Sequence, residues 1–273
     1  MNPKMISAGG QNIATYDSGG SGPTVFFLHG NSASSLTFQD QLEGDFGKKY
    51  RAVAMDLPGH GKSDDAADPE STYHMPGYAA VLAEVAQKLD AANGVFVGWS
   101  LGGHIVLEAS KLLTDAAGFI IFGTPPLAYP PDMDNAFLPN PSMAAAFADE
   151  LTQEQMEGFA AACLAADTAL DLAPYVADIA RTDDKARLTM GASIAPGNYA
   201  DEVEIVKNLD RPLAILHGEK EQLVNGDYFS SLEMPTLWRG EAQIIQGSGH
   251  TPQAEDPAAF NSLVGSFVDE VIR

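Results

Sequence analysis

A serine flanked by glycines lies between two apolar segments near the middle of the chain. Gly98-Trp99-Ser100-Leu101-Gly102 follows the apolar residues 95–97 and precedes a segment with helical spacing. In that context the pattern G-x-S-x-G is typical of a nucleophile elbow, a strained strand-to-helix turn that exposes a serine hydroxyl above a sheet. The glycines fit because a Cβ at either position would crowd the turn. The chemistry predicted here is nucleophilic attack by Ser100 on a carbonyl carbon.

The serine hydroxyl needs a base to remove its proton, and the chain has six histidines. His250 ends a Gly-Ser-Gly-His loop directly after the last predicted strand, at the edge of a parallel sheet where ligands bind. This position makes His250 the predicted base. His217 also ends a strand, where a packing role is equally expected, and His104 is expected to pack along the helix after Ser100. The remaining three, in loops or without context, are His29, His60 and His74.

The base in turn needs a carboxylate that holds the imidazole in the right tautomer and stabilises its cation. In one recurring chain order of serine, acid and histidine, the acid follows the strand that here ends at Leu216. Glu219 and Glu221 both follow that strand. Position alone leaves both as candidates, and a solvated loop charge is the alternative interpretation of Glu219.

A tetrahedral oxyanion needs two N–H donors that are already in place. The backbone N–H of Leu101, at the predicted helix start, is one candidate donor. The other is the backbone N–H of Asn31, in the turn His29-Gly30-Asn31 after the first buried strand. An ordinary β-α turn would explain Gly30 but not its occurrence in one chain with the elbow, a late carboxylate and a last-loop histidine. Together these elements predict a serine hydrolase.

These side chains require a sheet whose strand ends meet at one edge. Apolar runs that alternate with helical spacing predict parallel β-α-β crossovers and therefore an α/β fold with a mostly parallel central sheet flanked by helices. A hairpin around Gly9-Gly10 precedes them, and a helix that spans residues 38–46 follows the first buried strand. The last helix is the clearest, with Asp256 as its cap and Pro257 at its first position. The predicted buried strands cover residues 24–28, 50–55, 95–97, 119–122, 213–216 and 242–245.

The alternation stops after residue 124. Residues 125–205 show alanine-rich helical patterns instead, one of which begins with a capping box at Thr152 and Gln155. We interpret them as a helical cap inserted between two parts of the core, residues 1–124 and 206–273. Bulky apolar side chains of this cap are candidates to line a channel for an acyl chain, although each one alone is more typical of a packed core. With Gly30 and Trp99, the predicted substrate-binding residues are Met133, Phe137, Phe147, Met156 and Phe159, and Met143 and Tyr175 are further candidates.

The composition disfavours several classes of partner. With 37 Asp and Glu against 15 Lys and Arg, the net charge is −22, which disfavours nucleic acid and anionic membranes because both attract a basic surface.

The single cysteine, Cys163, allows no internal disulfide and is expected to be a packing residue. The chain has no apolar run long enough to span a bilayer and no secretory signal at its N-terminus, so we expect a cytoplasmic protein.

On these residues the chain resembles the α/β-hydrolase fold superfamily over nearly its whole length. Within it, the chain is most similar to the metal-independent α/β-hydrolase N-acylhomoserine lactonases, which degrade quorum-sensing signals. That resemblance includes a glutamate as the acid and so favours Glu221, and it departs at Phe159, where a tyrosine is expected. The similar stretches are Leu28–Ser32, Gln41–Gly44, Asp56–Ser63, Gly98–His104 and Gly123–Pro126.

The resemblance implies quorum quenching, in which the lactone ring of an N-acyl-homoserine lactone is opened through an acyl-enzyme on Ser100. A small ester or lactone is then the only expected partner, and no cofactor or metal is expected. A zinc lactonase is disfavoured because no His-x-His-x-Asp-His cluster is present. Ser100 disfavours haloalkane dehalogenases and epoxide hydrolases, which use a carboxylate nucleophile in this fold.

Other activities fit the same set of residues. A general carboxylesterase of small or medium acyl esters is the nearest alternative, followed by a cofactor-free perhydrolase or C–C hydrolase. A signal receptor that retains the triad but turns over slowly belongs to a different class. The sequence predicts neither the chain-length preference nor the oligomeric state.

Overall fold

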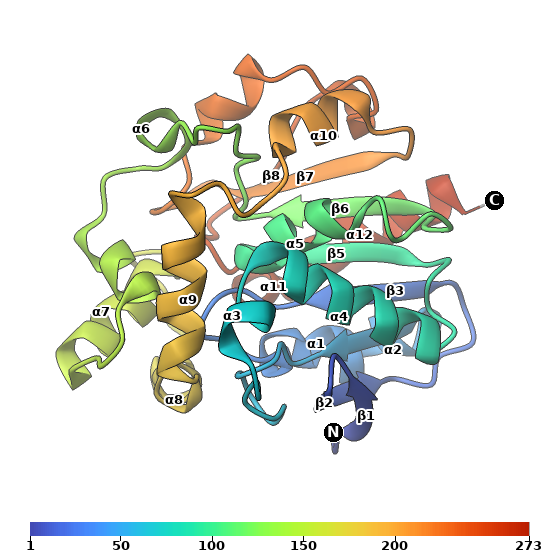
Figure 1. Cartoon of the computed structure of the whole chain (residues 1–273). Coiled ribbons are helices and arrows are strands. Elements are labelled where there is room, and N and C mark those ends of the chain that lie inside the picture. Colours follow the sequence, from blue (N-terminus) through green and yellow to red (C-terminus); the bar gives the residue numbers. More distant parts are fainter. Residues whose placement is uncertain (273) are drawn as a thin grey trace.

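The computed structural model describes residues 1–272, and their strands form one sheet in the order β1-β2-β4-β3-β5-β6-β7-β8 (Figure 1). The pairs β1–β2 and β2–β4 are antiparallel, and every other neighbouring pair is parallel. This arrangement confirms the predicted α/β class with its N-terminal hairpin. The strands are β1 (Lys4–Ala8), β2 (Gln11–Asp17), β3 (Thr24–Leu28), β4 (Arg51–Met55), β5 (Val95–Trp99), β6 (Gly118–Phe122), β7 (Leu213–Gly218) and β8 (Gln243–Ile245).

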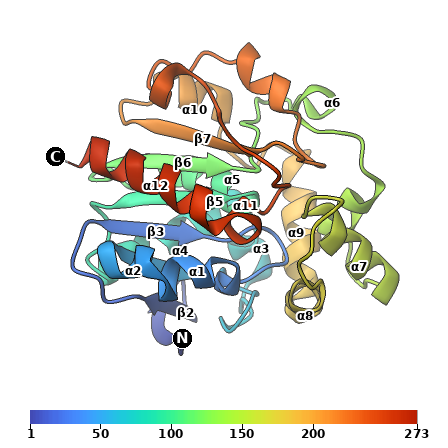
Figure 2. The same cartoon turned by 180° about the vertical axis from the view of Figure 1, so that it is seen from behind.

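Helices cover both faces of the sheet. The described helices, those of the cap included, are α1 (Gln39–Glu43), α2 (Asp45–Lys49), α3 (Pro69–Thr72), α4 (Met75–Lys88), α5 (Leu101–Ala109), α6 (Met133–Ala136), α7 (Gln153–Ala162), α8 (Ala173–Arg181), α9 (Asp184–Ile194), α10 (Glu202–Asn208), α11 (Pro252–Glu255) and α12 (Pro257–Val271). Helices α4, α5 and α10 lie on one face, seen in Figure 1, and α1, α2, α11 and α12 lie on the other, seen in Figure 2. Short 3₁₀ helices span Ser35–Phe38, Pro141–Phe147, Gly226–Ser231 and Trp238–Gly240.

The hydrophobic core is divided by the sheet into two clusters. Phe26 stacks on Phe96 in the first cluster, with ring centroids 5.5 Å apart. Phe27, the next residue of β3, packs on Phe38 in the second, at 5.0 Å. Successive strand residues point to opposite faces, and both faces are covered, so the central strands are continuous apolar runs.

One predicted helix differs from the structure. Residues 38–46 form the separate helices α1 and α2, which meet at Gly44. Gly44 has an extended ψ of −166°, and a Cβ on it would lie 2.4 Å from the carbonyl oxygen of Asp40. Only glycine fits at this sharp turn, because a side chain here would displace the preceding turn of helix. In contrast, α12 begins as predicted, with the Asp256 carboxylate accepting from the Ala259 N–H at 2.9 Å.

Between β6 and α10 the described chain contains helices and loops but no strand longer than the single bridge of Phe137 to Val224. The capping box of Thr152 and Gln155 is present at the start of α7. Helix α10 runs through residue 205, at which the sequence analysis ends the cap, and it packs against α5 of the core. The exact division into core and cap remains a prediction.

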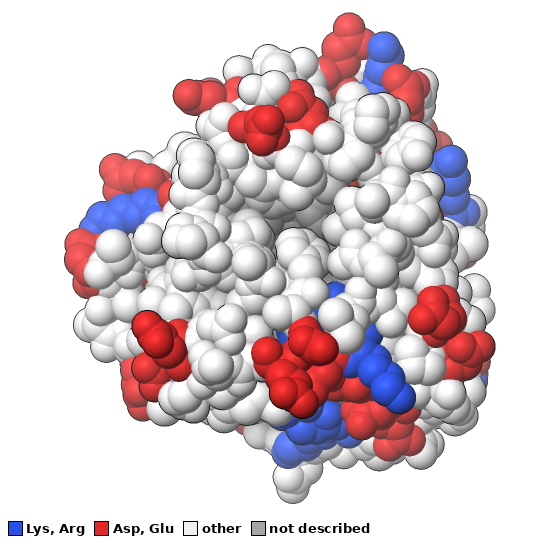
Figure 3. Space-filling view, turned by 60° about the vertical axis from the view of Figure 1, so that its left-hand side comes forward, with Lys and Arg blue, Asp and Glu red and all other residues white. Residues whose placement is uncertain are grey.

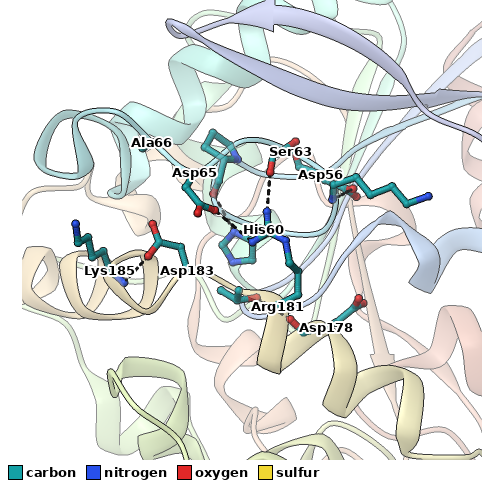
Figure 4. A network of polar contacts seen from close by, with 12 residues as sticks. Asp56, His60, Ser63, Asp65, Ala66, Asp178, Arg181, Asp183 and Lys185 are labelled. Carbon is teal, nitrogen blue, oxygen red and sulfur yellow. Dashed lines mark hydrogen bonds and ion pairs between the residues drawn. The ribbon is translucent and has the colours of Figure 1, made fainter.

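The cap is held against the loop that follows β4. Arg181, the last residue of α8, donates to Asp65 Oδ1 at 3.2 Å and to the Ser63 carbonyl at 2.9 Å. The N–H of Asp183 donates to the Gly59 carbonyl at 2.9 Å. Figure 4 shows these side chains converging from α8 and the start of α9 on the loop. The contacts fix one side of the cap above the carboxyl ends of the strands.

A buried arginine joins three segments inside the cap. The Arg187 guanidinium, 2% exposed, donates to the carbonyls of Ala148 at 2.9 Å, Asp149 at 2.8 Å and Ile179 at 3.2 Å. Asp184 provides the opposite charge. The planar fork of a guanidinium can serve several acceptors at once, so this residue organises loop ends that would otherwise leave carbonyls unpaired.

Candidate active site

Ser100 lies at the turn between β5 and α5. Its backbone has φ 53° and ψ −122°, and its N–H donates to the Phe122 carbonyl at 2.8 Å. Such a conformation is strained for a residue with a side chain and is often found at catalytic sites. A Cβ on Gly98 would lie 2.4 Å from the Gly102 carbonyl oxygen, and one on Gly102 would lie 2.3 Å from that of Leu28. The two glycines are therefore required by close backbone approach, as the elbow pattern predicts.

His250 and Glu221 form a buried pair after the last two strands. His250 Nδ1 lies 2.8 Å from Glu221 Oε2, and each side chain is 3% exposed. Burial alone would raise the pKa of the Glu221 carboxyl, but the charge and hydrogen bond of His250, together with the bond from the Leu223 N–H, lower that pKa below its ordinary value. The ionised carboxylate holds Nδ1 and leaves Nε2 available as a base.

The alternative acid lies elsewhere. Glu219 is exposed, and its Oε2 accepts from the Gly247 N–H at 2.9 Å, at the start of the loop that carries His250. It contacts the backbone of that loop, whereas Glu221 contacts the imidazole of His250. The geometry supports Glu221 as the acid.

The imidazole of His250 is held beside the elbow. A Cβ on Gly123 would lie 2.6 Å from His250 Cε1, so the ring packs directly over the backbone of this glycine. Gly123 follows Phe122, whose carbonyl accepts from the N–H of Ser100. Ser100 and His250 accordingly line one cavity. This places the predicted nucleophile and base on the same wall of the cavity.

The two residues predicted to provide the oxyanion donors also line this cavity. Leu101 is the first residue of α5, where a backbone N–H has no intrahelical acceptor and the helix dipole favours negative charge. Asn31 follows β3, and its side-chain amide donates to the Ala146 carbonyl of the cap at 2.7 Å. A Cβ on Gly30 would lie 2.9 Å from Ser100 Cβ, so only glycine lets this turn approach the nucleophile so closely. The positions match an oxyanion hole assembled from the β3 and β5 turns.

The cavity wall is mainly apolar and is shared between core and cap. Met133 and Phe147 are 37% and 36% exposed as well as lining the cavity, which therefore reaches the surface on the cap side. Figure 3 shows a hollow on that side, surrounded by uncharged side chains, with charged residues further out. The sequence-predicted residues on the wall are Gly30, Trp99, Met133, Phe137, Met143, Phe147 and Phe159.

Two cap residues proposed from the sequence do not line this cavity. Met156 lies one turn before Phe159 on α7 and packs, partly buried, against the second core cluster without lining the cavity. Tyr175 lines a neighbouring cavity that shares Asn31, Trp99 and Phe159 with the first one. Helical spacing places Met156 and Phe159 on the same face of α7 but cannot show which of the two meets the cavity.

One polar side chain on the cavity wall was not expected there from the sequence. His104 was expected to pack along its helix, but its Nδ1 lies 2.9 and 2.8 Å from the two carboxylate oxygens of Glu202 and its ring lines the cavity. The only sequence signal is its spacing of one helical turn from Ser100, because Glu202 is 98 residues away.

The other histidines have structural roles. Burial lowers the pKa of His29 to about 4 and that of His60 to about 3, which keeps both rings neutral. His29 Nε2 accepts from the Leu57 N–H at 2.9 Å. His74 accepts from the backbone at the start of α4, and burial lowers the pKa of His217.

Two features are absent from residues 1–272. No cluster of three or more His, Cys, Asp and Glu side chains in this part of the chain could hold a metal ion. No helix within it combines the length and apolar character needed to cross a bilayer.

Comparison with known families gives a match over most of the chain. A sequence profile described as the Alpha/beta hydrolase family matches residues 25–263. This range contains the elbow, the cap and the histidine loop.

The chain is similar in structure to the N-acyl homoserine lactonase AidH complexed with N-butanoyl homoserine. The two are 36% identical with a TM-score of 0.95, and the match covers 100% of this chain and 98% of the other. An esterase of Mycobacterium tuberculosis is 28% identical over 92% of this chain and 84% of its own length. A pimeloyl-[acyl-carrier protein] methyl ester esterase of Xanthomonas oryzae is 27% identical over 92% of this chain and 97% of its own.

Proposed function

This chain belongs to the alpha/beta hydrolase family, and we propose that it is a serine hydrolase that opens the lactone ring of N-acyl-homoserine lactones. The observation that carries the proposal is the likeness to an N-acyl homoserine lactonase over the whole chain, cap included, at 36% identity. The cap decides the substrate in such a site because it covers the nucleophile. Likeness restricted to the core would support only the reaction type.

In the proposed reaction Ser100 Oγ attacks the ring carbonyl carbon while His250 Nε2 takes its proton. The N–H groups of Leu101 and Asn31 stabilise the oxyanion. When the intermediate collapses, the ring C–O bond breaks and His250 returns the proton to the leaving alkoxide. Water then attacks the acyl-enzyme with His250 as base and Glu221 as the partner of its cation. The ester bond to Ser100 Oγ breaks, and His250 returns the proton to Ser100. The product is the open-chain N-acyl-homoserine carboxylate.

The leaving alcohol of a lactone stays attached to the acyl group. Its effective concentration for re-closing the ring is therefore high, and water must compete with it at the acyl-enzyme. The net charge of −22 favours release of the product, since an acidic protein repels the carboxylate that ring opening forms. The neutral lactone experiences no such repulsion.

The apolar cavity supports an acyl chain as part of the substrate. Met133, Phe137 and Phe147 contribute apolar wall between Ser100 and the surface. Burial of a chain on such a wall contributes about 0.8 kcal/mol for each methylene group. We therefore expect affinity to rise with chain length until the chain reaches the opening.

A general carboxylesterase is the second candidate function. It is supported by the esterases among the relatives, at 27% and 28% identity. Both functions use the same triad, so they differ only in what the cavity accepts.

The test compares both substrate classes. The protein is incubated with N-butanoyl-, N-hexanoyl- and N-dodecanoyl-homoserine lactone and, in parallel, with p-nitrophenyl esters. We expect ring-opened product, measured by mass spectrometry, with wild type and none with Ser100→Ala. Ser110→Ala, at the end of the same helix, is the matched control.

Other outcomes reject the proposal. Cleavage of the simple esters alone would leave the carboxylesterase as the function. Tight binding of the lactones with almost no turnover would instead indicate a receptor.

A further inference from the structure

His104 and Glu202 form a second histidine–carboxylate pair at the catalytic cavity. The Glu202 side chain is fully buried, and both its oxygens lie within hydrogen-bond distance of His104 Nδ1, at 2.9 and 2.8 Å. Glu202 also accepts from the Leu127 N–H at 2.8 Å, and its own N–H donates to the Leu127 carbonyl at 2.8 Å. These contacts fix the carboxylate, and the carboxylate fixes the imidazole ring.

The orientation of the ring leaves one nitrogen for a ligand. In the tautomer that donates from Nδ1 to the Glu202 carboxylate, Nε2 carries a lone pair and is a hydrogen-bond acceptor. His104 lies four residues after Ser100, which corresponds to about 6 Å along α5. Side chains of a helix tilt toward its N-terminus, and this brings the ring back toward the nucleophile. Both residues line the same cavity.

His104 is the polar side chain of this wall that the proposed reaction does not use. Among the described wall residues, those with an amide, hydroxyl or imidazole side chain are Asn31, Ser100, His104 and His250. Ser100 and His250 react, and the Asn31 amide is engaged by Ala146 and Ser32. Phe159, on the same wall, has no polar group.

We infer that His104 is a specificity-determining residue. Its Nε2 accepts a hydrogen bond from a substrate N–H whose nitrogen is bonded to the carbon next to the attacked carbonyl. The inference rests on the proposed function, because an N-acyl-homoserine lactone carries its amide nitrogen on the ring carbon beside the carbonyl. When Ser100 attacks that carbonyl, the amide must lie in the cavity too. Burial of this amide N–H without an acceptor would cost about 1–3 kcal/mol of binding free energy. The preferred substrates are thus α-acylamino lactones and esters.

The test compares substrates that differ only in this N–H. The first pair is N-hexanoyl-homoserine lactone and its analogue in which CH₂ replaces the amide N–H and the side-chain carbonyl is kept. The second pair is N-acetylglycine p-nitrophenyl ester and p-nitrophenyl 4-oxopentanoate, which are related in the same way. The measured quantity is the ratio of kcat/KM within each pair. A loss of folding lowers both members equally and leaves this ratio unchanged.

We expect wild type to prefer the N–H substrate by roughly tenfold, as one net hydrogen bond allows. His104→Phe should bring the ratio to about one, and His104→Gln, whose amide oxygen can accept, should keep part of the preference. Met190→Leu, a change of apolar wall, is the matched control and should keep the wild-type ratio. Thermal unfolding of each variant is measured alongside.

Equal ratios in wild type and His104→Phe would overturn the inference, and His104 would then only join α5 to α10. Loss of the preference in Met190→Leu as well would also overturn it, because cavity shape alone would then set the ratio. The ester pair separates this inference from the proposed function. If no lactone is opened but the N-acetylglycine ester is preferred through His104, the lactonase proposal fails and the N–H subsite stands.

Discussion

The indole N–H of Trp99 donates a hydrogen bond to the backbone carbonyl of His250 at 2.7 Å. The two residues are 151 positions apart, and their rings pack at 5.8 Å between centroids. Trp99 immediately precedes Ser100, the proposed nucleophile. The strand that presents Ser100 therefore also fixes the loop that presents His250, the proposed base, and movement of one would disturb the other.

Trp99→Phe tests this connection. It keeps an aromatic ring but removes the N–H, which leaves a buried carbonyl without its donor. We expect the free energy of unfolding to fall by about 1–3 kcal/mol and kcat to fall by up to roughly tenfold. Urea unfolding and turnover of p-nitrophenyl butyrate measure the two effects.

Trp238→Phe is the matched control. Trp238 is also buried, and its indole N–H donates to Glu270 at 2.7 Å, in contact with α12 rather than the site. It should lose stability without a change in kcat. A kcat loss of the same size in both variants would show that the effect is general and not transmitted to His250.

Glu221→Gln should remove most of the activity. The amide cannot stabilise the imidazolium and can hold His250 in the wrong tautomer, so we expect kcat to fall by roughly 10³- to 10⁴-fold. Glu219→Gln can still accept from Gly247 and should stay within about twofold of wild type, as surface substitutions usually do. Steady-state kinetics on one p-nitrophenyl ester is sufficient. The reverse order of the two losses would move the acid to Glu219.

Much of the fold was predictable from the sequence because the signals are local. Buried parallel strands are continuous apolar runs, and α12 shows its cap, its N1 proline and one apolar face within 16 residues, Asp256 to Val271. The separation of α1 from α2 was not predictable from spacing. It depends on the approach of Gly44 to the Asp40 carbonyl, a contact that apolar periodicity does not report.

The candidate site also has one part that the sequence predicts and another that it does not. Ser100, His250 and the turn at Asn31 follow strands, and strand ends of a parallel sheet converge at one edge. The pairing of His104 with Glu202 has no such signal, because it depends on how α10 packs on α5. In the cap, the helical pattern of α7 identified Phe159 and Met156 equally, although only Phe159 reaches the cavity.

The contact of Asp178 with Ser34 should make stability depend on pH. Asp178 Oδ2 accepts from the Ser34 hydroxyl at 2.7 Å between α8 and the core. Burial, with a further contribution from Asp56, raises the pKa of the Asp178 carboxyl from 3.8 to about 6. Between these values the folded state binds more protons than the unfolded state, so this group lowers the free energy of unfolding as pH rises from about 4 to about 7.

Asp178→Asn keeps an acceptor for Ser34 and removes the charge. We expect the variant to be more stable than wild type by about 1–2 kcal/mol at pH 8, a value reduced for partial solvent screening, and equally stable near pH 4. Urea unfolding at the two pH values measures this difference. Asp171→Asn, an exposed carboxylate just before the same helix, should show no such pH dependence. A constant difference at both pH values would contradict the assignment.

Gly123→Ala should displace the His250 ring without substituting any residue of the proposed triad. Gly123 has φ +59°, and an added Cβ would lie 2.6 Å from His250 Cε1 and 2.9 Å from Nδ1, so the ring must move. A displacement of about 1 Å at a catalytic group can reduce turnover roughly 10²-fold. The positive φ adds a loss of about 1 kcal/mol in stability.

Gly10→Ala separates the two effects, since Gly10 has φ +82° with no atom within 4 Å of an added Cβ. Both variants should lose similar stability in urea unfolding, but only Gly123→Ala should lose kcat. Full activity in Gly123→Ala would show that His250 works from a position other than the one over this glycine, and the pairing with Glu221 at 2.8 Å would then not be the catalytic one.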